Sequence, residues 1–545
     1  MTATIKTRSG RYTLESALET EASFLVSVDD TKSLTALLAA LWDKRDAIAA
    51  TAKSHLGLGW RDDCRVMPMD AWVCGGFNTC VLVEVHRGSK AIGSSQSHAS
   101  TPLSISQYVF RVCMPHKLAE SQYPGTIDEK MRCEVAAYAW IEEHCAEIRT
   151  PELIGFGFTS GPRFTHVRYL PWYTRWFHFI RKGIRSMLDR PLLTNYKRCH
   201  AVVNSTPTSK HNHLGLGYVL LEHIGSDTGL PLSATWKQQQ IRQQQREPAS
   251  NHQHLRRHNL YRSISRIMLS LARLPQQRIG SFSFNPVDCT VSLDNRPLVC
   301  ATVQLEATGA QRTIPPSQTY ERADVYVADV LTLHDNHFMA NPHAVRDTKD
   351  ARERLAMRTL WRTVSHRFAS RGPLQENIPQ LDLAVGNLVV DDDWNVTCLM
   401  GLDWMAVLPV SALAVPHWLT GCKLHQIRGE QYDAYDSARR AFLEVMRQQQ
   451  QSADNAVEIA RALEDSWQSR AVWFWASLRS TSAWVFLFED HILPFFAPGT
   501  KVSQLVKVAS FWDADIDAVV ETKLADEEQY QAELRQLFEH EGKDV

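Results

Sequence analysis

The stretch from Leu381 to Val390, together with Gly401-Leu-Asp-Trp404 after it, restricts the fold of this chain more than any other segment. Asp382 and Asn387 form the pattern D-x4-N. The β-branched residues that follow predict a strand, and the polar turn after them predicts a hairpin. The spacing places a carboxylate and a carboxamide on one short loop, as a base and a metal ligand are placed in phosphoryl transfer.

The length of the chain predicts more than one folding unit. At 545 residues it exceeds the size at which a single hydrophobic core usually stops growing. We expect four parts along the chain. These are an N-terminal helical extension over 1–60, an N-terminal lobe over 61–222 with an insertion at 159–213, a C-terminal lobe over 223–430 whose key segment is 380–404, and a helical region over 431–545.

The composition is typical of a cytoplasmic protein. The formal net charge is −1, so no overall field attracts nucleic acid or an anionic membrane. The eleven cysteines include no C-x-x-C pair, which favours reduced thiols. The first 30 residues contain no continuous apolar run of the secretory type, and no stretch reaches the roughly 20 apolar residues that span a bilayer.

Local patterns in the chain predict a sheet followed by many helices. Cys74-Gly-Gly-Phe-Asn78 supplies a turn within a hairpin over 69–86. Further strands are expected at 108–113, 153–158 and 218–221, and helices at 31–56, 128–143, 255–274, 351–368 and through most of 430–545. The segments 88–106 and 238–254 have the composition of a hairpin tip and a surface loop.

The insertion is basic and aromatic. From Arg163 to Arg198 it holds nine Lys or Arg residues against one acid, Asp189, interleaved with Trp, Tyr and Phe. We favour a pair of helices lying on the protein with the aromatic side chains inward and the arginines outward. Two other interpretations stay open: a lid over a substrate pocket, and a patch for nucleic acid or a membrane surface.

The ordered set of motifs resembles the fungal aminoglycoside-phosphotransferase-like family. Four pieces that follow the D-x4-N loop match the family pattern in order: Val-Val-Asp-Asp-Asp-Trp at 389–394, Val396-Thr-Cys-Leu399, Leu408-Pro409 and Pro416-His-Trp-Leu-Thr420. The resemblance implies an α+β, two-lobed protein-kinase-like fold with extra C-terminal helices. It also implies ATP and Mg²⁺ between the lobes and a small-molecule hydroxyl as acceptor. The family shares the basic insertion, which argues against nucleic acid as a partner.

The resemblance assigns roles to individual residues. Asp382 would accept the proton of the substrate hydroxyl, and Asn387 would bind magnesium. The residues expected around the nucleotide are Gly75 and Gly76 in the turn over the phosphates, Arg111 with its helix partner Glu134, and Glu222 and Ile224 in the hinge beside adenine.

One departure from the family pattern affects the expected activity. Gly401 stands where the family carries its magnesium-binding Asp, and Asp403 comes two residues later. Two residues of extended chain shift a carboxylate by about 6.5 Å, whereas magnesium needs its oxygens at about 2.0–2.1 Å. Asp403 can therefore replace the missing metal ligand only if the loop changes register.

Three hypotheses for function remain open at this point. The first is an ATP-dependent phosphotransferase with impaired or atypical metal-dependent catalysis. The second is an inactive pseudokinase that binds a nucleotide, a metabolite or a partner. The third is a kinase-like fold reused for another biosynthetic reaction.

Overall fold

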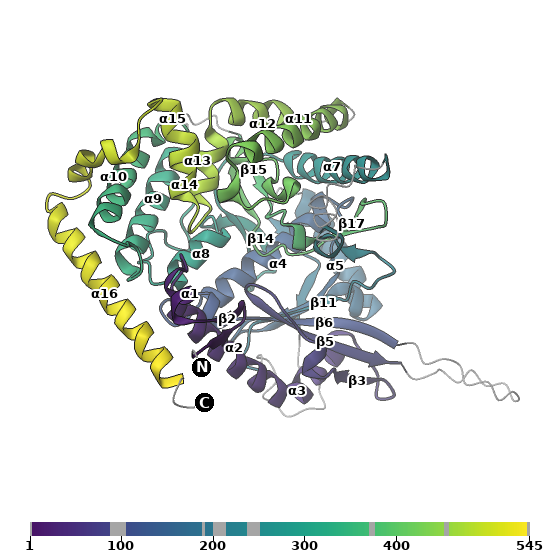
Figure 1. Cartoon of the computed structure of the whole chain (residues 1–545). Coiled ribbons are helices and arrows are strands. Elements are labelled where there is room, and N and C mark those ends of the chain that lie inside the picture. Colours follow the sequence, from purple (N-terminus) through teal and green to yellow (C-terminus); the bar gives the residue numbers. More distant parts are fainter. Residues whose placement is uncertain are drawn as a thin grey trace, which may run out of the picture.

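The computed structural model describes most of the chain as a mixed α+β structure (Figure 1). The described ranges are 3–87, 105–187, 191–199, 214–236, 251–369, 376–451 and 457–541. Most of the expected hairpin tip and of the expected Gln/His-rich loop lies outside these ranges, as does part of the insertion.

An eight-stranded antiparallel sheet dominates the first half of the chain. Its order is β10-β8-β7-β11-β6-β5-β3, and β4 pairs with β5. The strands are β3 (Asp63–Val66), β4 (Val73–Cys74), β5 (Asn78–His86), β6 (Ile105–Cys113), β7 (Leu153–Gly157), β8 (Arg163–His166), β10 (Tyr196–Arg198) and β11 (Tyr218–Glu222). The predicted hairpin and the predicted strands at 108–113, 153–158 and 218–221 are therefore confirmed.

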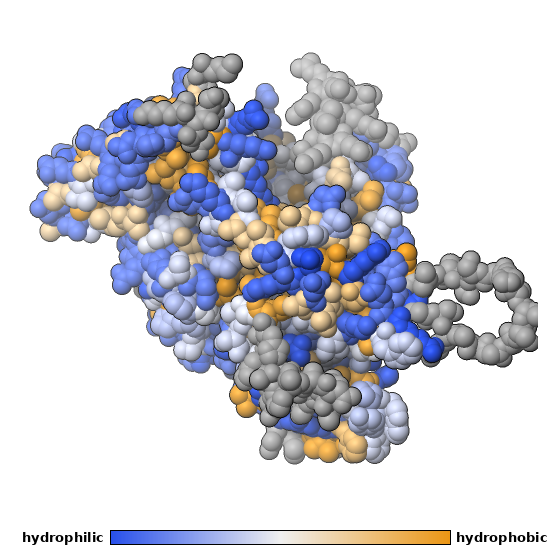
Figure 2. Space-filling model, turned by 90° about the horizontal axis from the view of Figure 1, so that it is seen from below, coloured by the Kyte–Doolittle hydropathy of each residue, from blue (hydrophilic) through white to orange (hydrophobic). Residues whose placement is uncertain are grey.

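Alternating apolar residues bury both faces of this sheet. Val81, Val83 and Val85 of β5 pack in one cluster with Ile48 of α3 (Arg45–His55). Tyr218 and Leu220 of β11 belong to the same cluster, whereas Val219 between them belongs to a second cluster that includes residues of α4 (Thr126–His144). Successive side chains of a strand point to opposite faces of the sheet, so a strand that is covered on both faces contributes neighbouring residues to two different clusters. Figure 2 views the molecule from below, and the visible surface there mixes hydrophilic residues with hydrophobic patches.

The predicted helix over 31–56 is two helices. α2 (Phe24–Asp43) ends at Asp43, and α3 begins at Arg45, after the single residue Lys44. The helical spacing continues across the junction, so the periodicity alone could not locate the break. The predicted helix at 128–143 is confirmed as α4.

A buried histidine fixes α3 to the sheet. His55 Nδ1 lies 2.7 Å from Thr165 Oγ1 and Nε2 lies 2.8 Å from the Tyr218 hydroxyl. A Cβ at Gly155 would lie 2.3 Å from His55 Nδ1, so only glycine leaves room for the ring there. Burial, with a further effect of Arg163, lowers the pKa of His55 from 6.5 to about 3.

The low pKa of His55 predicts a loss of stability in acid. Between pH 6.5 and about 3 the unfolded chain binds a proton at this site that the folded chain does not, so the free energy of unfolding falls as pH falls. From pH 6.5 to 5 the loss is about 1.6 kcal/mol, slightly less than 1.36 kcal/mol per pH unit, because the unfolded histidine is only half protonated at pH 6.5. Urea unfolding at both pH values measures it. His55→Gln should remove this part of the pH dependence, whereas the exposed His540→Gln control should retain it. If the free energy of unfolding changed equally with pH in both variants, His55 would not be the cause.

Helices and short sheets make up the second half. The short strands are β12 (Leu230–Pro231), β13 (Ser281–Asn285), β14 (Thr290–Asn295), β15 (Asn377–Gln380), β16 (Leu388–Val390), β17 (Val396–Leu399) and β18 (Ala406–Pro409). The longer helices are α7 (Asn251–Ala272), α8 (Cys300–Ala307), α9 (Ala323–Ala340), α10 (Thr348–Ser365), α11 (Glu430–Gln451), α12 (Ile459–Gln468), α13 (Ala471–Leu478) and α16 (Ile516–Glu541). The helices predicted at 255–274, at 351–368 and beyond 430 are confirmed.

The largest apolar core joins the two halves. It contains Val219 of the sheet, Trp140 of α4, Ile264 of α7 and Val407 of β18. Trp140 stacks on Phe282 of β13 with ring centroids 5.3 Å apart. The chain passes from the expected N-terminal lobe to the expected C-terminal lobe near residue 222, but the apolar core is continuous between the two parts.

The N-terminal segment packs against the end of the chain. It begins with the hairpin β1 (Ile5–Thr7) and β2 (Gly10–Tyr12), so the first 60 residues are not purely helical. Phe24 of α2 stacks on Phe538 of α16, and the backbone N–H of Phe24 donates to the Tyr530 hydroxyl at 2.9 Å. Figure 1 shows the two termini close together beside α16.

The expectation that the aromatic side chains of the insertion point inward was wrong. The described part contains one long helix, α5 (Trp172–Met187). The aromatic side chains of α5 point to solvent: Trp172 and Phe179 are each 76% exposed.

Within the described part of the chain, no helix is both long and apolar enough to cross a membrane.

Candidate functional site

The D-x4-N residues lie on one loop, as expected. Asp382 and Asn387 precede β16, and the Asn387 carboxamide donates to the backbone carbonyl of Asp382 at 2.9 Å. The backbone carbonyl of Asn387 accepts from the N–H of Met400 at 2.7 Å. Trp418 Nε1 donates to the carbonyl of Leu383 at 2.7 Å and holds the middle of the loop.

Asp382 lies at the surface in crowded surroundings. Its side chain is reached by water. Desolvation by the surrounding protein nevertheless raises the pKa of Asp382; Arg479 opposes this effect and Asp403 adds to it. A raised carboxyl pKa makes the carboxylate a stronger base, which suits a group that accepts a proton.

Asn387 lies where a side chain at position 401 would begin. Gly401 has φ +71°, and a Cβ built there would lie 2.6 Å from Asn387 Oδ1 and 2.9 Å from Nδ2. An aspartate at 401 would therefore collide with Asn387 unless that side chain moved. The expected metal ligand is absent, and the carboxamide of the other ligand fills part of its space.

Gly401→Ala should lower the free energy of unfolding by about 1–3 kcal/mol, because it adds a methyl group against Asn387 in a left-handed backbone conformation. Thermal or urea unfolding measures this loss. Gly386→Ala, in the neighbouring D-x4-N loop before β16, is the control, since its Cβ would meet nothing within 4 Å. Similar losses for both variants would mean that the contact with Asn387 is not the cause.

The carboxylate of Asp403 is held by three residues from the first half of the chain. Asn78 Nδ2 donates to Oδ1 at 2.8 Å, and Lys130 Nζ donates to the same oxygen. Arg111 Nη1 lies 3.7 Å from Oδ2. Burial alone would raise the pKa of Asp403, but Arg111 and Lys130 outweigh it and hold the pKa well below its usual range. Asp403 is therefore a buried, charged anchor for the sheet and α4.

Glu134 completes a neutral cluster of four charges. It accepts from Arg111 and, at 2.9 Å, from Lys130, which lies one helical turn earlier on α4. The Lys130 side chain is fully buried, and its ammonium lies 5.7 Å from the ring centroid of Trp404. The expected Arg111–Glu134 pair is thus present, but its neighbours are Lys130 and Asp403.

Two residues that contact Asp403 were missed from the sequence. Asn78 was noted only as the end of a turn, and Lys130 was not singled out. Lys130 stands four residues before Glu134, which places both side chains on the same face of α4. That spacing was a local signal from which Lys130 could have been found, whereas the sequence around Asn78 contains no such signal.

The residues present do not fit magnesium. Among the described residues, no group of three or more His, Cys, Asp or Glu side chains is placed to hold a metal ion. Asp403 already binds two cationic groups, and an added Mg²⁺ would lie beside Lys130 and Arg111. The repulsion and the loss of buried ion pairs both oppose metal binding at Asp403.

The expected phosphate turn is partly used by other groups. The N–H of Gly75 donates to the carbonyl of Asn78 at 2.8 Å, as in an ordinary hairpin. Arg8 from the N-terminal hairpin donates to the carbonyls of Cys74 and, at 2.6 Å, Gly75. A Cβ at Gly76 would meet nothing within 4 Å, so Gly76 is the more open of the two glycines.

The expected hinge residues lie at the end of β11. Glu222 accepts from Arg149 at 3.2 Å and from the backbone N–H of Glu152 at 3.2 Å. Ile224 follows in a loop and is half-buried. These contacts fix the start of the connection to the second half of the chain.

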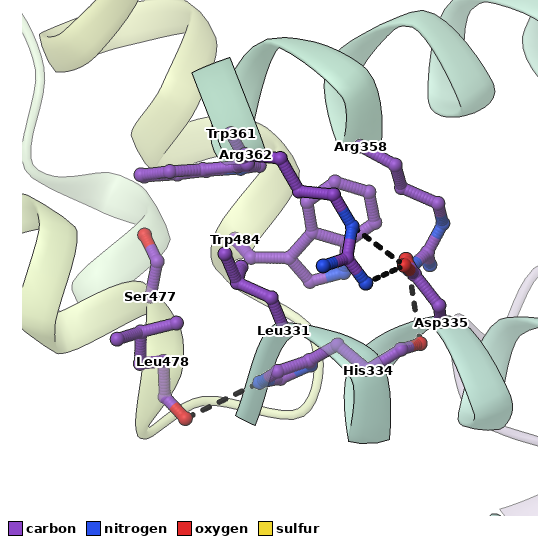
Figure 3. Close-up of a pocket in the computed structure, with 9 residues that line it drawn as sticks. All are labelled: Leu331, His334, Asp335, Arg358, Trp361, Arg362, Ser477, Leu478 and Trp484. Carbon is purple, nitrogen blue, oxygen red and sulfur yellow. Dashed lines mark hydrogen bonds and ion pairs between the residues drawn. The ribbon is translucent and has the colours of Figure 1, made fainter. Parts of the chain in front are cut away.

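A small pocket lies elsewhere, between α9, α10 and the segment of α13 and α14 (Trp484–Leu487) (Figure 3). Arg358 and Arg362 both bind Asp335 there, at 2.9 and 2.5 Å. His334 Nε2 lies 3.2 Å from the carbonyl oxygen of Leu478, and burial lowers the pKa of His334 to about 4. None of the expected site residues lines this pocket.

Comparison with known proteins adds no assignment, because neither the protein-family models nor the curated proteins searched contain a match to this chain.

Proposed function

We propose that this chain is a two-lobed, kinase-like protein of the aminoglycoside-phosphotransferase type that has lost magnesium-dependent phosphoryl transfer and acts by binding. Two features support the kinase-like part. An ion pair joins Arg111 on β6 to Glu134 on α4, where kinases pair a strand lysine with a helix glutamate. A D-x4-N loop leads into the hairpin β16–β17, in the order that the motif requires.

The loss of transfer rests on one observation, the neutralised state of Asp403. Phosphoryl transfer needs metal ions that bridge the phosphates and offset the charge that develops on them. Position 401 supplies no carboxylate, and the Asp403 carboxylate pairs with Lys130 and Arg111. Freeing Asp403 for a metal would leave the two buried cations, Lys130 and Arg111, to share the single carboxylate of Glu134, at a cost of about 3–5 kcal/mol.

An active phosphotransferase is the second candidate, and Asp382 favours it. Its carboxyl has a raised pKa and lies on the expected loop, so it retains the properties of a base. Such an enzyme would have to neutralise the phosphates with Arg111 and Lys130 in place of a metal, which requires Asp403 and Glu134 to release them.

Calorimetric titration of ATP, with and without Mg²⁺, tests the proposal. We expect magnesium to leave the ATP affinity unchanged within about twofold, because the described residues include no group of three or more side chains placed to hold a metal ion, and we expect no ATP hydrolysis. Asp382→Asn is the control, since it removes the candidate base and leaves the charged cluster intact. A magnesium-dependent gain in affinity, with ATP turnover that Asp382→Asn abolishes, would instead establish the phosphotransferase.

A further inference from the structure

Helix α5 lies on the protein with its polar side inward. Thr174, His178, Lys182 and Arg185 recur at helical spacing, and all four are partly buried. Lys182 forms an ion pair with Glu143 of α4 at 2.5 Å and donates to Asn195 at 3.3 Å. These contacts fix the rotation of the helix about its axis, which is the reverse of the usual orientation of an amphipathic surface helix.

The opposite side of α5 is apolar and faces solvent. At about 100° per residue, its apolar side chains cover a sector of roughly 160°. The exposed members are Trp172, Tyr173, Trp176, Phe177, Phe179, Ile180, Ile184 and Met187. Single exposed apolar residues are ordinary, but a continuous face of this kind marks an interaction surface.

Positive charges border the apolar face on both sides. Arg175 lies at one edge of the sector and Arg181 at the other, and both are exposed. Acidic residues nearby already have partners: Glu143 pairs with Lys182, Glu152 pairs with Arg168, and Glu142 accepts from Asn195 at 2.8 Å and lies 3.1 Å from His166 Nε2. The surface around α5 is therefore positive, although the whole chain is nearly neutral.

We propose that α5 binds the surface of a membrane that contains anionic lipids, lying in the plane of the interface. A broad apolar face bordered by arginines, with Trp and Tyr at one end, is the composition of interfacial helices. The apolar side chains would enter the boundary between headgroups and acyl chains, and Arg175 and Arg181 would pair with the headgroups. This inference does not depend on the proposed function.

Two other occupants fit less well. A symmetric contact with a second copy would bring the same arginines of both subunits together, and like charges oppose such a contact. Nucleic acid would need basic groups along the backbone path, whereas the centre of this face is apolar and the arginines lie at its edges.

Vesicle flotation with the full chain tests the proposal. We expect binding to phosphatidylcholine vesicles that contain phosphatidylserine, weaker binding to phosphatidylcholine alone, and a loss of the difference at high salt. The double variant Trp176→Glu/Phe179→Glu should abolish binding, and Arg175→Gln/Arg181→Gln should weaken it roughly 25-fold, about fivefold for each arginine. Phe511→Glu is the matched control, because Phe511 is 84% exposed elsewhere on the chain; it should bind as the wild type does.

Several results would overturn the proposal. One is a wild-type chain that does not float with anionic vesicles at low salt. Another is flotation that the α5 variants and the Phe511 control reduce equally. Sedimentation equilibrium provides a third: a dimer that Trp176→Glu/Phe179→Glu dissociates, with no vesicle binding by the wild type, would assign the face to a second copy. Binding of single-stranded RNA that needs Arg175 and Arg181, again without vesicle binding, would assign it to nucleic acid.

Discussion

Replacing Lys130 by methionine is expected to lower the free energy of unfolding by about 3–5 kcal/mol, because it leaves two buried carboxylates with too few cations. Lys130 is fully buried and binds both Glu134 and Asp403. Methionine keeps most of the apolar length of the side chain, so the loss reports on the charge. Urea unfolding followed by far-UV circular dichroism measures it.

Two comparisons make this result specific. Lys349→Met removes an exposed lysine and should change the free energy of unfolding by less than about 0.5 kcal/mol. The double variant Lys130→Met/Asp403→Asn removes one charge of each sign and leaves the Arg111–Glu134 pair, so its loss should be smaller than the sum of the single losses. Additive losses would show that Lys130 and Asp403 do not stabilise each other.

Arg296→Met should have an effect of similar size, about 3–5 kcal/mol. Arg296 is fully buried and binds Glu129 of α4 and Glu306 of α8, at 2.8 and 2.5 Å. Without it, Glu129 loses its cation and Glu306 retains only Arg312. The same unfolding measurement applies.

The control for Arg296 is Arg278→Met. Arg278 is half-exposed and lies 3.4 Å from the largely exposed Glu321, so its loss should cost less than about 1 kcal/mol. Equal losses for the two arginine variants would contradict the view that burial of the ion pairs raises the cost of removing the cation.

The sequence predicted those parts of the fold that depend on neighbours along the chain. The period of two in β5 and the helical spacing in α4, α7 and α10 are local patterns, and the structure contains these elements at the expected places. The D-x4-N loop is also local, since Asp382 and Asn387 meet through a turn of six residues.

The cluster around Asp403 could not be predicted in this way. Asn78 and Lys130 are separated from Asp403 by 325 and 273 positions, and only the packing of the sheet and α4 against the second half brings them together. Position 403 was therefore considered only as a substitute metal ligand. The structure instead places its carboxylate among cations, a role that has no local signature.

The orientation of α5 was missed for a different reason. A helical pattern shows which residues share a face, but it does not show which face meets the protein. The usual assumption is that the apolar face is inward because burial of apolar area is favourable. Here Glu143 and Asn195 receive Lys182 of the polar face, and the aromatic residues remain outside.

The contact between Phe24 and Tyr530 has a consequence for synthesis of the chain. The two residues are 506 positions apart, yet the N–H of Phe24 donates to the Tyr530 hydroxyl. At roughly 5–20 residues per second, Tyr530 leaves the ribosome roughly 25–100 s after Phe24 does. During that interval Phe24 of α2 has Tyr12 of the N-terminal hairpin as a native neighbour, but not the residues of α16. Helix α2 of the nascent chain thus waits for α16 to cover it, and a chaperone that binds exposed apolar segments could act there during that interval.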